Sequence, residues 1–446
     1  MRLAVSITGI LVLALGMGCR GTLQGPDESG EFVQLLPGAT PPRNLLMISI
    51  DTLRVDRVGR YAAGESYTPH LDALMSEAAV LDSHFSCSNW TFPSISCVLG
   101  GRSAVDSGYV PPIMTGFPDS YPEEDDFLAD FMKDEGYVTA MVAANGFLCP
   151  DLGVGDYDEV TCRPNSTATQ ISDFTLSTYD QALAGGGPWY LHAHYIDPHQ
   201  PYNAQLAYMP PLSEVPTIPF DITNSGDLRI IESDFEGMPE DLQQDVLDNL
   251  HIFYSANVAY VDAEIRRLLD GLEERGALED TLVVFWSDHG EQLLDHGGLG
   301  HTVALYGEET RALALFWAPG IIGGGSWSGL TTHADLLPTT FGVMGLPVPE
   351  QATGTPIGLR SAGRSTFEVQ AWDDGSAQLG VTQDGWRMFY AWDGTKELYD
   401  LRDDPLERAN IYDSEDPKVL ELWNLMMPEV LRVKQVHGGE PVEVGP

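Results

Sequence analysis

The sequence predicts an α/β protein built around a mainly parallel β-sheet. Five short apolar runs support this fold class: "NLLMISID", "YVTAMVAA", "WYLHAHYID", "TLVVFWSDHG" and "LALFWAPG". They lack the alternation of a half-exposed strand, and this is typical of strands covered on both faces of a parallel sheet. Helical stretches lie between them, and strands that alternate with helices indicate α/β architecture.

The clearest helix is expected over residues 254–275, where apolar residues recur at helical spacing and Gly276 provides a stop signal. The apolar stripe consists of Val258, Val261, Ile265, Leu268, Leu269 and Leu272. The segment 203–247 is acidic and Pro-rich, and we interpret it as an insertion. After about residue 360 the pattern changes and predicts a hairpin, a turn and a closing helix over 415–436.

The composition is that of a globular protein with a strongly acidic surface. The chain has 446 residues, of which 43% are hydrophobic, enough for a large core. Its formal net charge is −43, from 66 acidic and 23 basic residues. A field of that sign repels nucleic acid and anionic membrane surfaces, so we expect neither as a binding partner. An anionic substrate would then need metal ions that reverse the sign locally.

Residues 1–19, "MRLAVSITGILVLALGMGC", have the pattern of a secretory signal peptide. The apolar run over 3–17 is too short for an ordinary membrane span. The ending "LGMGC" resembles a bacterial lipoprotein cleavage box, with Cys19 as the lipid-bearing residue. We therefore expect an exported lipoprotein with residues 20–42 as a tether, touching the membrane only through its lipid. A cleaved signal without lipid is the alternative.

Four cysteines remain after Cys19: Cys87, Cys97, Cys149 and Cys162. An even number in an exported protein indicates disulfides. Three pairings are possible, and proximity in the sequence favours Cys87–Cys97 and Cys149–Cys162. Free buried thiols are the alternative.

Polar residues stand at the ends of several predicted strands. Asp51 follows the first, Asp288 and His289 follow a later one, and Asp197 and His199 follow a third. The carboxyl ends of strands line the ligand crevice of open α/β sheets. Carboxylates beside a histidine suit a divalent cation. A single Asp after a strand is usually a cap, but so many such sites in one chain favour a metal site.

Successive blocks of the sequence resemble the sulfatase family of the alkaline-phosphatase superfamily. These blocks are "NLLMISIDTLRVDRVGRY", "DPHQPY", "TLVVFWSDHGE", "GHTVALYGEETRALALFWAPG", "THADLLPTT" and "ELYDLRDDPLERANI". The resemblance implies a doubly wound core, which we expect over 43–360, and a small C-terminal α+β subdomain over 361–446. It also implies metal-assisted hydrolysis of sulfate or phosphate esters.

The resemblance implies that Asp51, Asp288 and His289 bind metal together with Thr91. One or two divalent cations are expected, of Ca, Mn, Mg or Zn. Sulfatases usually carry a second Asp after the first, but Thr52 stands there. This chain therefore has one expected ligand fewer.

The stretch 89–102, "NWTFPSISCVLGGR", holds the position of the nucleophile. The sulfatase motif is Cys or Ser, any residue, Pro, any residue, Arg, and "TFPSI" matches it with Thr91 first and Ile95 in place of the Arg. A Thr cannot become formylglycine. Thr91 is instead the nucleophile type of phosphodiesterases in the same superfamily, where attack would give a phospho-Thr. The alternative is that Thr91 is only a helix N-cap. "NGFL" at 145–148 also lacks the Lys that sulfatases use to contact sulfate.

In the resemblance, His199 belongs to a block that contacts substrate. His301 lies where sulfatases often have Lys and where other relatives have a second-metal His. Both are expected to bind phosphoryl oxygens or to protonate the leaving group. Asp197 is a further substrate-binding candidate, and with both histidines it could instead form a second metal site. The remaining histidines near these blocks are interpreted as supporting or packed groups: His192, His194 and His296.

The predicted function is a metal-dependent hydrolase of phosphate monoesters, diesters or phosphonates, acting through a phospho-Thr on a small anionic ester. A sulfuric ester hydrolase with a Thr nucleophile is one alternative. An inactive sulfatase-like binding lipoprotein is another. The retained set of Asp51, Thr91, Asp288 and His289 argues against the inactive form.

Overall fold

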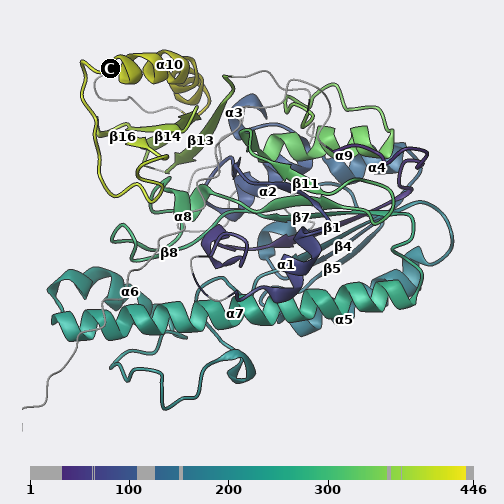
Figure 1. Ribbon diagram of the computed structural model, residues 1–446, viewed down its shortest axis with the longest axis horizontal. Coiled ribbons are helices and arrows are strands. Elements are labelled where there is room, and N and C mark those ends of the chain that lie inside the picture. The colour runs from purple at the N-terminus through teal and green to yellow at the C-terminus, as the bar shows by residue number, and fades with distance from the viewer. Residues whose placement is uncertain are drawn as a thin grey trace, which may run out of the picture.

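The computed structural model describes residues 33–62, 64, 66–107, 126–149, 154–358, 363–372 and 374–437 (Figure 1). The signal peptide and lipid-bearing Cys19 expected over 1–19, and most of the tether, lie outside the described residues. Within the described ranges, no helix is both long and apolar enough to cross a membrane.

A central sheet of eight strands forms the core, in the order β11-β2-β10-β7-β1-β6-β4-β5. These strands are β1 (Asn44–Ile50), β2 (Ala79–Leu81), β4 (Val138–Ala143), β5 (Glu159–Cys162), β6 (Trp189–Tyr195), β7 (Thr281–Ser287), β10 (Ala314–Trp317) and β11 (Gly325–Trp327). β1 pairs in parallel with both β6 and β7, while β10 runs antiparallel to β7 and β2. The predicted α/β fold with a mainly parallel sheet is confirmed.

Helices cover both faces of this sheet, as Figure 1 shows. On one face lie α1 (Pro69–Met75), α5 (Ala168–Thr178) and α7 (Glu240–Glu274). On the other face lie α2 (Thr91–Gly100), α4 (Leu128–Asp134) and α9 (Leu336–Met344). The two faces of β1 explain this, since Leu46, Ile48 and Ile50 enter one apolar cluster and Leu45 and Met47 another. The strand is apolar on both faces because both are buried.

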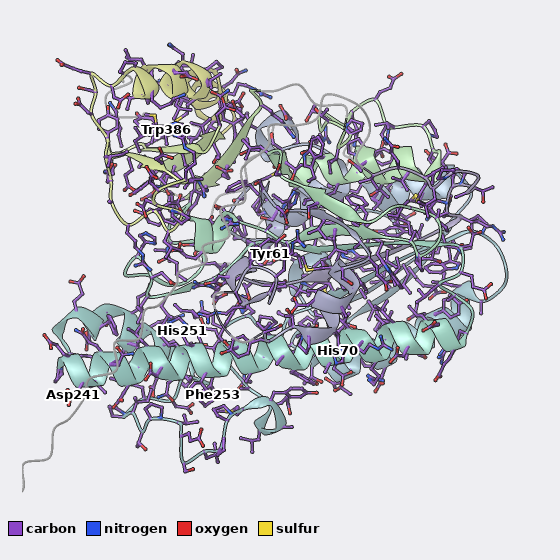
Figure 2. The ribbon with its side chains drawn as sticks, in the orientation of Figure 1. Tyr61, His70, Asp241, His251, Phe253 and Trp386 are labelled. Atoms are coloured by element: carbon purple, nitrogen blue, oxygen red, sulfur yellow. A yellow bond between two sulfur atoms is a disulfide. The ribbon has the colours of Figure 1, made fainter. Side chains whose placement is uncertain are left out.

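The helix predicted over 254–275 is the second half of α7, which begins at Glu240. Figure 2 shows Asp241, His251 and Phe253 along the first part of α7, which precedes the predicted range. Val246 and Leu250 are buried there and extend the apolar stripe. The helix ends where expected, because Gly276 takes a left-handed conformation with φ of +67°. The segment before it contains α6 (Ser225–Asp234) between short turns of 3₁₀ helix.

The C-terminal part forms a separate antiparallel sheet of β13 (Ser365–Ala371), β14 (Ala377–Gln383), β15 (Trp386–Ala391) and β16 (Lys396–Asp400). α10 (Pro417–His437) covers it, in agreement with the predicted hairpin and closing helix. Trp423 of α10 packs on Tyr390 of β15 with ring centroids 5.1 Å apart. The predicted boundary between 360 and 361 falls outside the described residues.

Short elements complete the chain. They are α3 (Ala104–Ser107), α8 (Gly307–Thr310), β3 (His84–Phe85), β8 (Gln292–Leu293), β9 (Leu299–Gly300) and β12 (Thr331–Thr332). The favoured disulfide pairing is confirmed, with Cys87 bonded to Cys97 and Cys149 bonded to Cys162. The first of these bonds joins cysteines that lie on either side of Thr91 in the sequence.

Candidate active site

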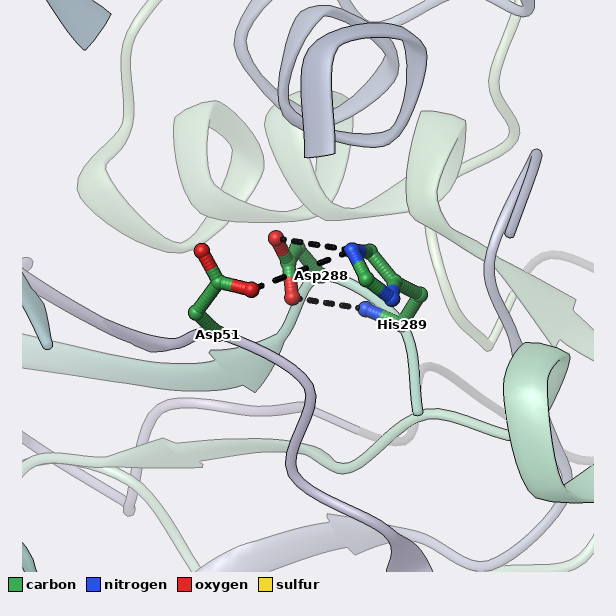
Figure 3. Close-up of side chains that lie close together, drawn as sticks. All are labelled: Asp51, Asp288 and His289. Carbon is green, nitrogen blue, oxygen red and sulfur yellow. Dashed lines mark hydrogen bonds and ion pairs between the residues drawn. The ribbon is translucent and has the colours of Figure 1, made fainter. Parts of the chain in front are cut away.

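The ends of β1 and β7 bring Asp51, Asp288 and His289 together (Figure 3). The two strands are parallel neighbours, and Ile50 lies opposite Ser287 in the register. The residues that follow them therefore leave the sheet at the same edge. One ligand atom from each of the three side chains lies within 4.8 Å of the other two, and all three side chains are buried.

The Asp51 carboxylate has one bonded oxygen and one free oxygen. Its Oδ2 accepts a hydrogen bond from Asn145 Nδ2 at 2.6 Å and one from His194 Nε2 at 3.3 Å. Its Oδ1 is buried and has no hydrogen-bond partner. Burial opposes ionisation, but the bond from His194 and the charge of His199 hold the pKa of Asp51 below its usual range.

The Asp288 carboxylate likewise has one oxygen with hydrogen-bond partners and one without. Its Oδ1 accepts the backbone N–H groups of Thr52 at 3.1 Å and His289 at 2.8 Å, while its Oδ2 is buried without a partner. Burial, followed by the nearby charge of Asp51, raises the pKa of Asp288 well above its usual value. Two buried carboxylates so close together repel each other unless a proton or a cation lies between them.

His289 completes the cluster with a nitrogen lone pair. Its Nδ1–H donates to the carbonyl of Gly290 at 2.8 Å, so the neutral ring has its lone pair on Nε2. That Nε2 lies 3.5 Å from Asp288 Oδ2 and 3.9 Å from Asp51 Oδ1. The two oxygens without partners and this nitrogen therefore face one another. Their positions and chemistry fit a divalent cation.

Thr91 lies beside the same three atoms. It is the first residue of α2, and its Oγ1 is 3.3 Å from His289 Nε2 and 3.4 Å from Asn145 Nδ2. The N-cap of the helix is Trp90. The alternative reading of Thr91 as only an N-cap is therefore wrong, because its hydroxyl faces the cluster rather than the helix backbone.

The other polar side chains of the stretch around Thr91 are bonded elsewhere. Ser94 Oγ contacts the Ser86 hydroxyl at 2.8 Å and the Ser88 carbonyl at 3.1 Å. Ser96 donates to the Pro93 carbonyl at 2.9 Å, and Cys97 is in a disulfide. Ile95, at the position of the sulfatase Arg, is 1% exposed and packs in the core.

His199 and His301 lie on the solvent side of the cluster. Both are partly exposed, and their ring centroids are 4.9 Å apart. The ring of His301 also lies 4.6 Å from that of His289. Burial lowers the pKa of His301, but the bond from its Nδ1 to Glu291 Oε2 at 3.4 Å outweighs this and raises it. Glu291 is itself held by the hydroxyl of Tyr202 at 3.1 Å.

The Asp197 side chain contacts α5 and lies near α7. Its carboxylate accepts the backbone N–H of Ala168 at the start of α5 and lies near Glu264 of α7. Burial raises its pKa to about 7, although the bond from Ala168 lowers it. Among the described side chains, it forms no metal-binding group with His199 and His301. This placement does not favour the predicted substrate contact.

Two residues at the site, Asn145 and Glu291, were not predicted from the sequence. Asn145 was noted only for a missing Lys, yet it contacts both Asp51 and Thr91. Its signal was its place two residues after β4. His194 has the supporting place expected of it, since it bonds Asp51, and Glu291 bonds His301. Both lie in or just after strands that lead to the site.

The doubly wound sheet and its antiparallel C-terminal subdomain define the alkaline-phosphatase-like class of α/β proteins. Within that class, the sulfatase family model matches residues 43–346, and the chain belongs to this family of ester hydrolases.

Similar proteins include both sulfatases and phosphonate hydrolases. The chain is 23% identical to the choline-sulfatase of Rhizobium meliloti (strain 1021), over 84% of this chain and 83% of that protein. A 2-O GAG sulfatase shares the fold with a TM-score of 0.68 and 19% identity, covering 89% and 92% of the two chains. The phosphonate monoester hydrolase from Silicibacter pomeroyi has a TM-score of 0.67 and 20% identity, covering 88% and 95%.

Proposed function

We propose that this chain is an exported, metal-dependent hydrolase of phosphate monoesters, diesters or phosphonates that acts through a phospho-Thr91 intermediate. One observation carries the proposal: the hydroxyl of Thr91 lies 3.3 Å from His289 Nε2, next to the unpartnered oxygens of Asp51 and Asp288. A nucleophile beside a cation site is the arrangement that phosphoryl transfer requires.

The identity of the nucleophile favours phosphorus over sulfur. Formylglycine provides an exit for a sulfated intermediate, and a Thr side chain cannot be converted to it. Water can cleave a phospho-Thr, whereas a sulfo-Thr has no comparably easy route. Ile95 in the core also removes the Arg of the sulfatase motif. Sulfatases and phosphonate monoester hydrolases share this fold alike, so the choice rests on the nucleophile.

The donor set favours some of the expected cations over others. Asp51 and Asp288 offer one free oxygen each, His289 offers a nitrogen, and Thr91 offers its hydroxyl. Ca²⁺ and Mg²⁺ prefer oxygen ligands alone, while a mixed set with imidazole favours Mn²⁺ or Zn²⁺. When bound, such a cation would favour the Thr91 alkoxide and offset the negative charge of the phosphoryl group.

The residues of the chain then have distinct tasks. Thr91 Oγ1 gives its proton to solvent water and forms a bond to phosphorus as the bond from phosphorus to the leaving oxygen breaks. His199 or His301 gives a proton to that oxygen, and Glu291 holds His301 in place. Asn145 donates to Thr91 Oγ1 and fixes its direction. Water afterwards cleaves the phosphorus bond to Thr91 and restores the hydroxyl.

The proposed compartment is outside the cytoplasm. The bonds Cys87–Cys97 and Cys149–Cys162 agree with an oxidising environment. We infer that Cys19 carries a lipid that anchors the mature protein. If so, Cys19→Ala should move the protein from the membrane fraction to the soluble fraction of its host, and an unchanged distribution would argue against the anchor.

Side-by-side assays of nitrophenyl phosphate, a phosphodiester, a phosphonate monoester and an aryl sulfate, with Mn²⁺ or Zn²⁺ added, test the proposal. We expect a phosphorus ester to be cleaved fastest and Thr91→Ala to abolish that activity. Ser94→Ala is the matched control, since this buried hydroxyl three residues away points to Ser86 and Ser88. Activity that survives in Thr91→Ala would refute the nucleophile, and a clear preference for aryl sulfate would favour the sulfuric ester alternative.

A further inference from the structure

Behind Asp51, a line of polar side chains crosses one face of the central sheet. His194 lies opposite Ser49 in the parallel register of β1 and β6, and His192 is two residues earlier on the same strand. Ser49 Oγ lies 2.7 Å from His194 Nδ1 and 2.8 Å from His192 Nε2. All three side chains are fully buried. The line ends at Asp51, where His194 Nε2 lies 3.3 Å from Oδ2.

With neutral rings, the direction of every hydrogen bond in this line follows from its Asp51 end. The ionised Asp51 only accepts, so His194 must donate from Nε2 and carry its lone pair on Nδ1. The single proton of Ser49 then points to His194 Nδ1. The oxygen of Ser49 therefore accepts from His192 Nε2, and the lone pair of His192 falls on Nδ1, which has no partner. Burial lowers the pKa of His192 to about 3, which keeps its ring neutral.

Packing does not explain these groups. Their neighbours on the same faces of β1 and β6, Leu45, Met47 and Tyr190, belong to an apolar cluster. A hydroxyl and two imidazoles in such a place cost free energy unless each is bonded, and His192 Nδ1 is not. Buried polar groups that break the local pattern are expected where they serve a site.

We propose that Ser49 and His194 are positioning residues that hold Asp51 with its free Oδ1 toward the cation, Ser49 by fixing the tautomer of His194. This inference rests on the cation site of the proposed function. The bond from His194 to Oδ2 leaves only Oδ1 available as a ligand, and Asn145 Nδ2 also donates to Oδ2, at 2.6 Å. Hydrogen bonds behind metal ligands orient them and strengthen binding.

The test measures Mn²⁺ affinity by titration calorimetry on chelator-treated full-length protein. Ser49→Ala and His194→Phe should each weaken binding by roughly 10- to 100-fold. His194→Gln, which keeps a donor for Asp51, should recover part of the loss. The matched control is Ser172→Ala, because this hydroxyl is also fully buried and bonds Tyr195, on the opposite face of β6. It should lower stability without changing the affinity for Mn²⁺.

A second measurement does not depend on any variant. The ¹⁵N chemical shifts of His194 in the metal-free protein should show a proton on Nε2 and a lone pair on Nδ1. A proton on Nδ1 would overturn the inference, and so would wild-type Mn²⁺ affinity in both Ser49→Ala and His194→Phe. Failure of the wild-type protein to bind Mn²⁺ or Zn²⁺ would instead refute the proposed function, so the two failures can be told apart.

Discussion

Replacing Asp288 with Asn should change the stability of the protein in opposite directions with and without the cation. A carboxylate oxygen of Asp51 and one of Asp288 lie within 4.8 Å of each other, and both side chains are buried. Two unit charges at 4.8 Å repel by about 3.5 kcal/mol at an effective dielectric constant of about 20. The chelated wild-type protein must bear this repulsion or keep Asp288 protonated. Asp288→Asn removes it, and the Asn oxygen can still accept from the backbone of Thr52 and His289.

The assay is urea unfolding at pH 8, in excess chelator and in saturating Mn²⁺. In chelator, Asp288→Asn should be more stable than wild type, by up to about 3 kcal/mol. In Mn²⁺ the order should reverse, because the variant loses a ligand and the stabilisation that binding provides. The control is Asp335→Asn, which breaks the ion pair of the buried Asp335 with the partly exposed Arg364 and should destabilise under both conditions. Equal destabilisation of Asp288→Asn in both conditions would refute the reasoning.

Further predictions concern the nucleophile, one titrating group and one histidine partner. Thr91→Cys should gain no aryl-sulfatase activity even with a formylglycine-generating enzyme, since Ile95 replaces the Arg of the motif; measurable sulfate release would contradict this. Because the pKa of Asp197 is raised to about 7, the folded state holds a proton that the unfolded chain has lost. As the pH rises from roughly 4 to 7, the contribution of the Asp197 carboxyl to the free energy of unfolding of the wild-type protein should fall by up to about 1.4 kcal/mol per pH unit. The stability of Asp197→Asn, measured by urea unfolding at each pH, should lack this slope. Parallel stability–pH curves for the variant and the wild type would refute the raised pKa of Asp197. Glu291→Gln should slow the hydrolysis of alkyl esters far more than that of nitrophenyl esters, because His301 loses its partner and an alkyl leaving group needs the proton more. An equal loss of rate for both kinds of ester would exclude acid catalysis through His301.

Much of the fold could be predicted because burial leaves a direct mark on the sequence. The runs that form β1, β6 and β7 are apolar on both faces, and the structure buries nearly every residue in them. The direction of β10 could not be predicted in this way, because an apolar run is the same whichever way it pairs. The first half of α7 was missed because its acidic, Pro-flanked segment hides the apolar positions of Val246 and Leu250.

The candidate site was predictable where a residue directly follows a strand. Asp51, Asp288 and His289 do so, and the structure brings them together with Thr91. Contacts made by side chains from distant loops leave no such mark. Asn145 reaches Asp51 across 94 positions of the sequence. Asp197 also follows a strand, but its carboxylate accepts a bond from Ala168 at the start of α5, because a residue at a strand end can turn its side chain toward neighbouring helices.

The most direct test of the account is to look for phosphate on Thr91 during turnover. The protein is mixed with a saturating phosphorus ester and Mn²⁺, quenched in acid, and digested for peptide mass spectrometry. The account predicts one phosphoryl group on the peptide that contains Thr91, localised to that residue, in wild type and in Ser94→Ala but not in Thr91→Ala. Rapid product release while Thr91 remains unmodified, or a sulfuryl group on Thr91 after reaction with an aryl sulfate but no phosphoryl group with any phosphorus ester, would contradict it.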